Sequence, residues 1–177
     1  MSGKGDPPAA AGGSDPYEVA RLIVLQRLSA APRSRSELAQ TLARRGIPDT
    51  AVTAVLDRMQ DVGLVDDVRY AEAWVQSRHA GRKLGRRALA AELRRKGIDD
   101  DVARRALAQV DAEGEFAAAT DLVRRKLRSM GSLSPEAKMR RLAGLLARRG
   151  YGAELSRQVI RDALADTGAG ESIAAGH

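Results

Sequence analysis

The sequence predicts an all-α protein in which three tandem three-helix repeats form an elongated, curved helical array. Composition gives the first reason: Phe and Trp occur once each and Tyr three times in 177 residues, while Arg, Ala and Leu are abundant. Such a composition favours helices packed through Leu and Ala over a large β-sandwich. The second reason is a run of basic residues followed by glycine, which recurs three times along the chain.

The repeat is positional. Gly46, Gly97 and Gly150 are 51 and then 53 residues apart. Aligning them superimposes LAQTLARRGIPDTAVTAVL (38–56), LAAELRRKGIDDDVARRAL (89–107) and LAGLLARRGYGAELSRQVI (142–160). In each segment two leucines four residues apart give a helix one apolar stripe, the basic last turn suits the helix dipole, and the glycine supplies a left-handed C-terminal residue. A second helix follows at once, so the three segments share one structural unit.

A further helical stretch precedes each pair, over residues 17–28, 69–79 and 115–130. We therefore expect three-helix repeats over 15–64, 65–112 and 113–166. The flanking segments 1–14 and 167–177 are rich in Gly, Ala and Ser without periodicity, and we expect both to be disordered tails.

Helix start signals support these boundaries. Short polar side chains cap the first backbone N–H groups of a helix, and a Glu three residues later completes a capping box. The expected caps are Asp15 with Pro16 and Glu18, Ser34 with Glu37, Asp66 or Asp67, Asp99, and Ser134 with Pro135. Capping also explains the acidic clusters 66–67 and 99–101 more simply than acid–base or magnesium chemistry.

The residue inventory argues against catalysis. With no cysteine, the chain has no disulfide, thiolate zinc site, iron–sulfur cluster or cysteine nucleophile. Of the two histidines, His177 lies in an expected tail and His79 has no partner cluster. No phosphate-loop or dinucleotide-binding glycine motif is present. We expect a non-enzyme without metal or cofactor.

The amino-terminal segment MSGKGDPPAAAGGSDP lacks the apolar centre of a signal peptide, and no apolar run approaches the roughly 20 residues that span a bilayer. These features predict a cytoplasmic protein.

The net charge of +7 is unevenly distributed. Residues 36–64 carry 3 basic against 4 acidic side chains, whereas residues 69–110 and 115–164 each carry 11 against 5, a net +6 in each. A field of this sign attracts nucleic acid or an acidic protein surface.

The segment 36–67 has the pattern of a helix-turn-helix followed by a wing. A DNA-reading second helix needs polar or basic side chains for the grooves. Residues 49–61, however, carry only Arg58 against three aspartates, which argues against sequence-specific DNA binding by the first repeat.

The segment 63–98 is the most informative. An Asp-capped helix there places Tyr70, Trp74 and Val75 at helical spacing for a core. This segment resembles the most characteristic segment of the RecX family in the order and spacing of the following residues: Asp67, Arg69, Tyr70, Ala71, Trp74, Arg78, Gly85, Leu89, Glu92, Leu93, Lys96, Gly97 and Ile98. The resemblance covers about residues 17–164; the third repeat departs from the pattern where Tyr151-Gly152 replaces Ile-Asp.

The resemblance implies a modular helical protein that binds in the groove of the RecA–single-stranded DNA filament. We expect a monomer, because each repeat can bury its apolar stripe against the next and no long heptad seam remains. Binding would reduce ATP hydrolysis, strand exchange and co-protease function of RecA, and so modulate recombination, DNA repair and the SOS response. The expected contact set for RecA or DNA is basic: Arg82, Lys83, Arg86, Arg87, Arg94, Arg95, Lys96, Arg124, Arg125, Arg148 and Arg149.

Two other functions remain open from the sequence. One is sequence-tolerant nucleic-acid binding without RecA, which the basic charge supports and the small number of aromatic side chains disfavours. The other, less well supported, is a winged-helix transcription regulator.

Overall fold

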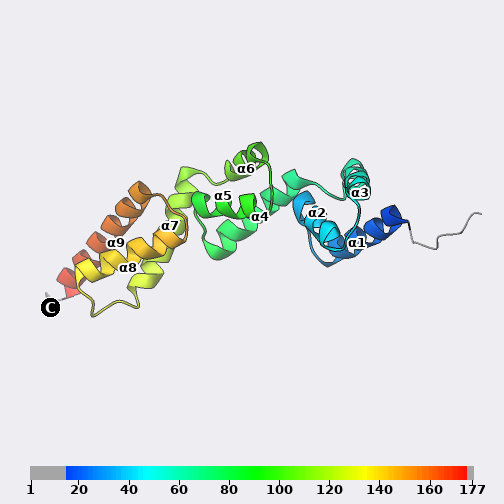
Figure 1. The fold of residues 1–177 in the computed structure, drawn as a ribbon. Coiled ribbons are helices and arrows are strands. Elements are labelled where there is room, and N and C mark those ends of the chain that lie inside the picture. Colours follow the sequence, from blue (N-terminus) through cyan, green and yellow to red (C-terminus); the bar gives the residue numbers. More distant parts are fainter. Residues whose placement is uncertain (1–14, 175–177) are drawn as a thin grey trace, which may run out of the picture. The chain divides into compact units, whose positions relative to one another are not determined.

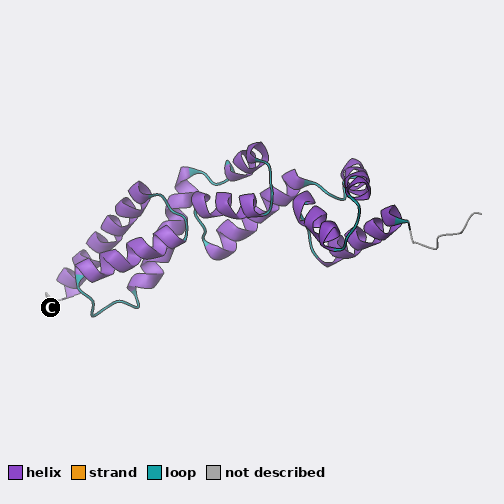
Figure 2. Cartoon of the chain, viewed as in Figure 1, coloured by secondary structure: helices purple, strands orange, loops and turns teal. Residues whose placement is uncertain are grey.

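The computed structural model describes the backbone of residues 15–174 and the side chains of residues 15–166. Within these residues the chain is helical, without a strand (Figures 1 and 2). Two compact units divide the chain, one ending at Val65 and the other beginning at Asp66. The all-α prediction is thus confirmed for the described residues, and no wing follows the helix-turn-helix of the first unit. The predicted tail 1–14 lies outside them.

The first unit is one three-helix repeat, α1 (Pro16–Ala30), α2 (Arg35–Arg44) and α3 (Asp49–Asp61). Leu38 and Leu42 of α2 are fully buried, as their spacing predicts, and they pack with Val24 and Val55 of the neighbouring helices. Burying each such side chain contributes about 1.5–3 kcal/mol. The unit therefore has a core of its own.

The second unit holds two repeats. The second repeat is α4 (Asp67–Arg82), α5 (Arg86–Arg95) and α6 (Asp100–Leu107), and the third is α7 (Ala112–Leu127), α8 (Pro135–Arg148) and α9 (Ala153–Ala174). Each has a separate core around its aligned leucines, Leu89 and Leu93 in one and Leu142 and Leu146 in the other. In Figure 1, α8 lies along α9 and α5 lies beside α4.

The repeated glycine ends the first helix of each pair in the same way. Gly46, Gly97 and Gly150 have positive φ angles of 73°, 68° and 83°. In each case the glycine N–H and the following N–H donate to carbonyls of the last helical turn, as at Gly150 to Ala147 (3.0 Å) and Tyr151 to Leu146 (3.1 Å). These paired bonds define a Schellman motif, which satisfies carbonyls that the helix leaves without partners.

The predicted caps are present. Ser34 and Glu37 form a complete capping box, and the side chains of Asp66, Asp99 and Ser134 accept backbone N–H bonds at the starts of α4, α6 and α8. Asp15 caps α1, but the expected partner Glu18 accepts from Arg21 instead (3.1 Å). The capping-box prediction at that helix is therefore wrong in its second half.

The helices expected over 17–28, 69–79 and 115–130 are observed over 16–30, 67–82 and 112–127, so their ends differ from the prediction by one to three residues. Helix α7 starts at Ala112 and not at 115, because Asp111 accepts a bond from the Gly114 N–H (2.7 Å). Helix α9 continues through Ala174, whereas a disordered tail was expected over 167–177; residues 175–177 lie outside the described residues. No proline interrupts the segment, so its backbone can extend the helix.

Helix α5 is capped by the third repeat. Its N-cap is Gly85, which has no side chain to satisfy the first N–H groups. Instead the Gly85 N–H donates to the Arg149 carbonyl (2.8 Å), the Arg86 N–H to Glu115 Oε1 (2.9 Å), and the Arg87 N–H to the Gly150 carbonyl (3.3 Å). The negative end of the α8 dipole thus faces the positive end of α5. We call this contact the junction.

The junction needs close backbone approach. A methyl group on Gly150 would lie 2.8 Å from the α-carbon of Ala88 and closer still to its backbone nitrogen, and one on Gly85 would lie 2.7 Å from the Gly150 carbonyl oxygen. Glycine at both positions is therefore required by the packing of backbone against backbone.

Tyr151 completes the junction. The residue is 3% exposed, and its hydroxyl donates to the Lys83 carbonyl (2.8 Å) at the turn between α4 and α5. Burial, with the negative charge of Glu115 as a further cause, raises the pKa of Tyr151 to about 12. The neutral phenol is therefore the form that the fold stabilises.

The substitution Gly150→Ala tests the junction against Gly46→Ala. Both change a positive-φ glycine, which costs about 1–2 kcal/mol in either case. A methyl group added at Gly150 would collide with the backbone of another repeat. A methyl group added at Gly46 would have no other atom within 4 Å. Urea unfolding followed by circular dichroism should show a larger loss for Gly150→Ala. Equal losses would contradict the close approach.

The Tyr151→Phe variant should alter the alkaline stability. The folded pKa of about 12 lies above the ordinary 10. The stabilisation it represents is therefore complete below pH 10 and is lost as the pH rises through 12. Between these values the free energy of unfolding of the wild type should fall more steeply than that of Tyr151→Phe. If the free energy of unfolding of the two proteins falls in parallel with pH, the fold does not raise the pKa of this phenol.

Candidate functional site: the basic surface of the second and third repeats

The expected contact set divides by exposure. Most of its members are exposed, whereas Lys83, Lys96 and Arg149 are half-buried. The exposed members are Arg82, Arg86, Arg87, Arg94, Arg95, Arg124, Arg125 and Arg148. All eleven belong to the second unit.

Several members of the set are used inside the protein. The Arg149 guanidinium donates to the Arg82 carbonyl, Lys83 pairs with Asp121 of α7 (3.6 Å), and one Arg86 nitrogen donates to the Val110 carbonyl (3.4 Å). These bonds hold the second and third repeats together or fix the start of α5. For these side chains the structure assigns a structural role that the sequence pattern did not indicate.

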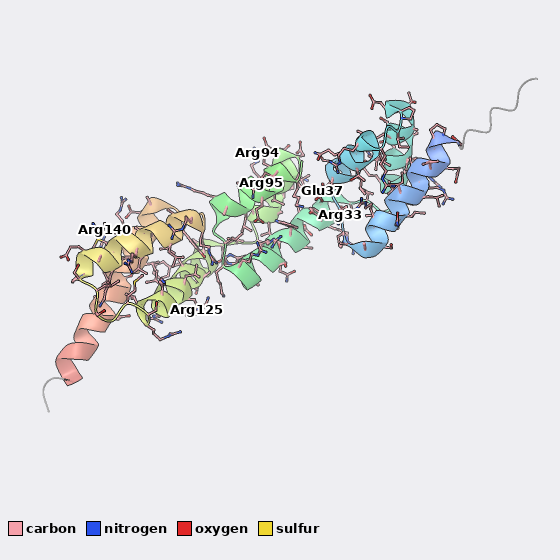
Figure 3. The ribbon with its side chains drawn as sticks, turned by 60° about the horizontal axis from the view of Figure 1, so that its bottom comes forward. Arg33, Glu37, Arg94, Arg95, Arg125 and Arg140 are labelled. Atoms are coloured by element: carbon pink, nitrogen blue, oxygen red, sulfur yellow. The ribbon has the colours of Figure 1, made fainter. Side chains whose placement is uncertain are left out.

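Other members remain directed at solvent. Arg94 and Arg95 lie next to each other near the end of α5 (Figure 3). Arg125 lies on α7, and in this view it is on the opposite edge of the second unit from Arg94 and Arg95. Arg124 pairs with Asp166 (3.4 Å), but both side chains are more than half exposed, so that pair contributes little. The basic set therefore covers more than one face.

Trp74 is the centre of a polar and aromatic cluster between α4 and α5. Its ring stacks on Tyr70 with centroids 5.7 Å apart, and its indole N–H donates to Glu92 (2.8 Å). The Arg78 guanidinium lies 4.2 Å and the Lys96 ammonium 4.7 Å from the ring centroid, within cation–π range. Arg78 also pairs with Glu92 (3.4 Å). The predicted core role of Tyr70 and Trp74 agrees with this packing.

The other residues of the characteristic segment are mainly architectural. Leu89, Leu93 and Ile98 are core residues, and Gly85 and Gly97 serve backbone turns. Asp67 and Arg69 occupy the first turn of α4, where Arg69 is exposed. His79, near the end of the same helix, contacts the Leu84 carbonyl through Nδ1 (2.9 Å).

A polar hollow in the first repeat was not predicted from the sequence. It is lined by three arginines, Arg27, Arg33 and Arg44, together with Glu37. Arg33 lies 3.9 Å from Glu37 (Figure 3), and its Nε is buried without a hydrogen-bond partner among the described residues. Counting charge over 36–64 missed the hollow because two of these arginines precede that window.

The junction was also missed. In the sequence Tyr151 is only a departure from the repeat pattern, yet in the structure it is a buried junction residue. Among the described residues, no three His, Cys, Asp or Glu side chains gather as a metal site. None of the described helices has the length and apolar character to cross a membrane.

Comparison with known proteins identifies the family. Three family models, described as the first, second and third three-helix domains of RecX, match residues 20–59, 66–107 and 113–160. The chain is also similar to two crystal structures, one titled as RecX from Lactobacillus salivarius (TM-score 0.78, 21% identity, 85% of this chain and 98% of that one) and one titled as regulatory protein RecX (TM-score 0.77, 22% identity, 90% and 81%). These likenesses show the fold.

Sequence relatives are closer. A protein named Regulatory protein RecX from Thermobifida fusca is 50% identical over 160 residues, which are 90% of this chain and 86% of the relative. Relatives of the same name from Streptomyces coelicolor (47% over 165 residues; 93% and 85%) and Mycobacterium tuberculosis (48% over 151; 83% and 87%) agree. The chain belongs to the RecX family of regulatory proteins.

Proposed function

We propose that this chain is a non-enzymatic, monomeric regulator that binds RecA and the RecA–single-stranded DNA filament in the cytoplasm. Binding lowers ATP hydrolysis, strand exchange and co-protease activity of RecA, and so modulates recombination, DNA repair and the SOS response. Support comes from the family, whose members are named regulatory proteins, and from the resemblance that implied RecA as the partner.

The observation that carries the proposal is the junction. It joins two repeats, each with a net charge of +6 over the counted segments, through backbone bonds at Gly85 and Arg87. Because the two basic repeats belong to one compact unit, they offer a preformed surface. A preformed surface loses less entropy on binding than separately moving modules would.

The mechanism we propose is occupation of a filament groove. Exposed arginines attract DNA phosphates and acidic side chains of the filament. The bound helices of this protein then obstruct conformational changes of the filament and the binding of its ligands, both of which the reactions of the filament need. Contacts of both kinds fit a surface whose arginines lie on more than one face.

Sequence-tolerant nucleic-acid binding without RecA is the second candidate. Single-strand binders combine a basic groove with exposed aromatic platforms for stacking bases. Tyr70 and Tyr151 are buried, and Trp74 is engaged by its own neighbours. These observations favour a function in which a protein partner supplies part of the contact.

Charge reversal tests the proposed contact set. The double variant Arg94→Glu/Arg95→Glu should raise the concentration that half-inhibits RecA ATPase about tenfold or more, because charged contacts to the filament become repulsive. The control is Arg104→Glu/Arg105→Glu in the same repeat. It changes the charge equally at exposed residues of α6 that are outside the set.

The control variant should inhibit RecA nearly as well as the wild type. If the two double variants lose inhibition equally, net charge alone would explain the effect, and the assignment of Arg94 and Arg95 would be wrong.

Salt dependence distinguishes the two candidate functions. Binding through phosphates alone weakens steeply with salt, because each neutralised phosphate releases counterions. We expect affinity for single-stranded DNA without RecA to fall more steeply between two salt concentrations than affinity for the RecA filament. Filter binding measures the affinity for single-stranded DNA, and ATPase titration measures the affinity for the RecA filament. Equal slopes, with inhibition only where DNA is bound tightly, would favour the nucleic-acid binder.

A further inference from the structure

An apolar groove runs between α8 and α9 in the third repeat. It has a volume of about 830 Å³, and its lining is mostly aliphatic carbon from both helices. Ala143 and Ala147 line the α8 side, where both are exposed, and Ile160 and Leu164 line the α9 side. Small residues on one wall let another backbone approach closely.

The groove leaves apolar surface exposed to solvent. Met139, which lines the groove from α8, is 53% exposed. An exposed apolar patch rimmed by polar groups is a mark of an interaction site. A groove between two helices is the shape that accepts an amphipathic helix, whose apolar side chains enter the groove in turn.

The charged residues that line the groove favour an occupant of negative charge. All the charged residues that line it are arginines: Arg87 of α5, and Arg157 and Arg161 of α9. Arg157 pairs with Glu154, but that pair is exposed, so it contributes little and can exchange. An occupant with carboxylates beside its apolar stripe would meet complementary charge.

The chain itself is poorly suited to fill the groove. Residues 1–14 contain one large apolar side chain, Met1, and residues 167–177 contain one, Ile173. Neither segment offers the row of anchors that a groove along two helices can hold. A second copy of this chain, with a net charge of +7, would bring like charge to the arginine rim.

We propose that the groove between α8 and α9 binds an acidic amphipathic helical segment of a protein partner. Apolar side chains of that segment pack on Met139, Ala143 and Ala147, and its carboxylates pair with Arg87 and Arg161. The inference rests on the proposed function, because it makes RecA the source of the segment. It adds that the groove contacts the recombinase protein and not the DNA.

A single fluorescent label tests the contact. The chain has no cysteine, so Met139→Cys gives one attachment site for an environment-sensitive dye at the groove. Leu22→Cys is the matched control: Leu22 is a similarly exposed apolar residue (60%) on α1 in the other unit. Preformed RecA–single-stranded DNA filament and the same DNA alone are the probes.

The emission of the dye at position 139 should shift to the blue when filament is added and not when DNA alone is added. The emission of the dye at position 22 should shift with neither. The proposal is overturned by three results: a shift with DNA alone, a shift that grows with protein concentration in the absence of RecA, which would indicate a second copy, or no shift while the labelled protein still inhibits RecA.

A groove variant gives an independent readout. Met139→Glu/Ala143→Glu should weaken inhibition of RecA ATPase about tenfold or more, because it removes an apolar anchor and repels an acidic segment. Leu22→Glu/Val62→Glu makes the same charge change at exposed apolar residues of the first unit. Both variants should bind single-stranded DNA equally, with circular dichroism confirming the helical fold.

The outcomes separate the two proposals. If the wild type inhibits RecA and the groove variant inhibits it equally well, the groove assignment fails and the proposed function stands. If the wild type neither binds nor inhibits the RecA filament, the proposed function fails and the groove assignment falls with it.

Discussion

The contact between Gly150 and the start of α5 is the constraint on which the second unit depends. The N-cap of α5 is Gly85, which has no side chain to accept a hydrogen bond, so carbonyls at the end of α8 take that role. Because no side chain separates the two backbones, the helix ends face each other directly, and their opposite dipole ends stabilise the approach. Any larger residue at Gly150 would force the two repeats apart.

The junction turns a sequence repeat into a functional arrangement. In each repeat, the glycine ends a helix with the same two hydrogen bonds. In the third repeat the same glycine also caps a helix of the second repeat. The residue that follows it, Tyr151 in place of the Ile at the aligned positions, reaches the turn at Lys83. One local motif thus serves both helix termination and the joining of two basic repeats.

Helices, caps and cores followed from the sequence because their causes are local. Leucines four residues apart, Ser34 three residues before Glu37, and glycine after a basic turn act within one or two helical turns. The junction could not be predicted in this way, since Gly85 and Gly150 are far apart in the chain and their pairing is tertiary. The same reason explains why Lys83 and Arg149 looked like solvent-facing cations although both hold the repeats together.

The candidate site was predicted in its charge and not in its shape. Counting basic residues identified the second and third repeats as the basic part of the chain. No sequence pattern indicated the groove between α8 and α9, because the residues of its two walls come together only when the helices pack. Three of the aromatic residues, Tyr70, Trp74 and Tyr151, make contacts within the fold that a DNA-binding platform would need to give up. The exposed basic side chains and the buried aromatic side chains together favour a partner that presents both a protein surface and phosphate groups.

The most direct measurement of the central claim is ATP hydrolysis by the cognate RecA on single-stranded DNA, with this protein added at fewer than one molecule per RecA, while RecA retained on the DNA is followed in parallel. Our interpretation predicts that hydrolysis falls while RecA is not merely displaced by competition for DNA. Unchanged hydrolysis at these ratios, or a fall that only tracks RecA displaced by occupied DNA, would contradict a regulator that acts on the filament.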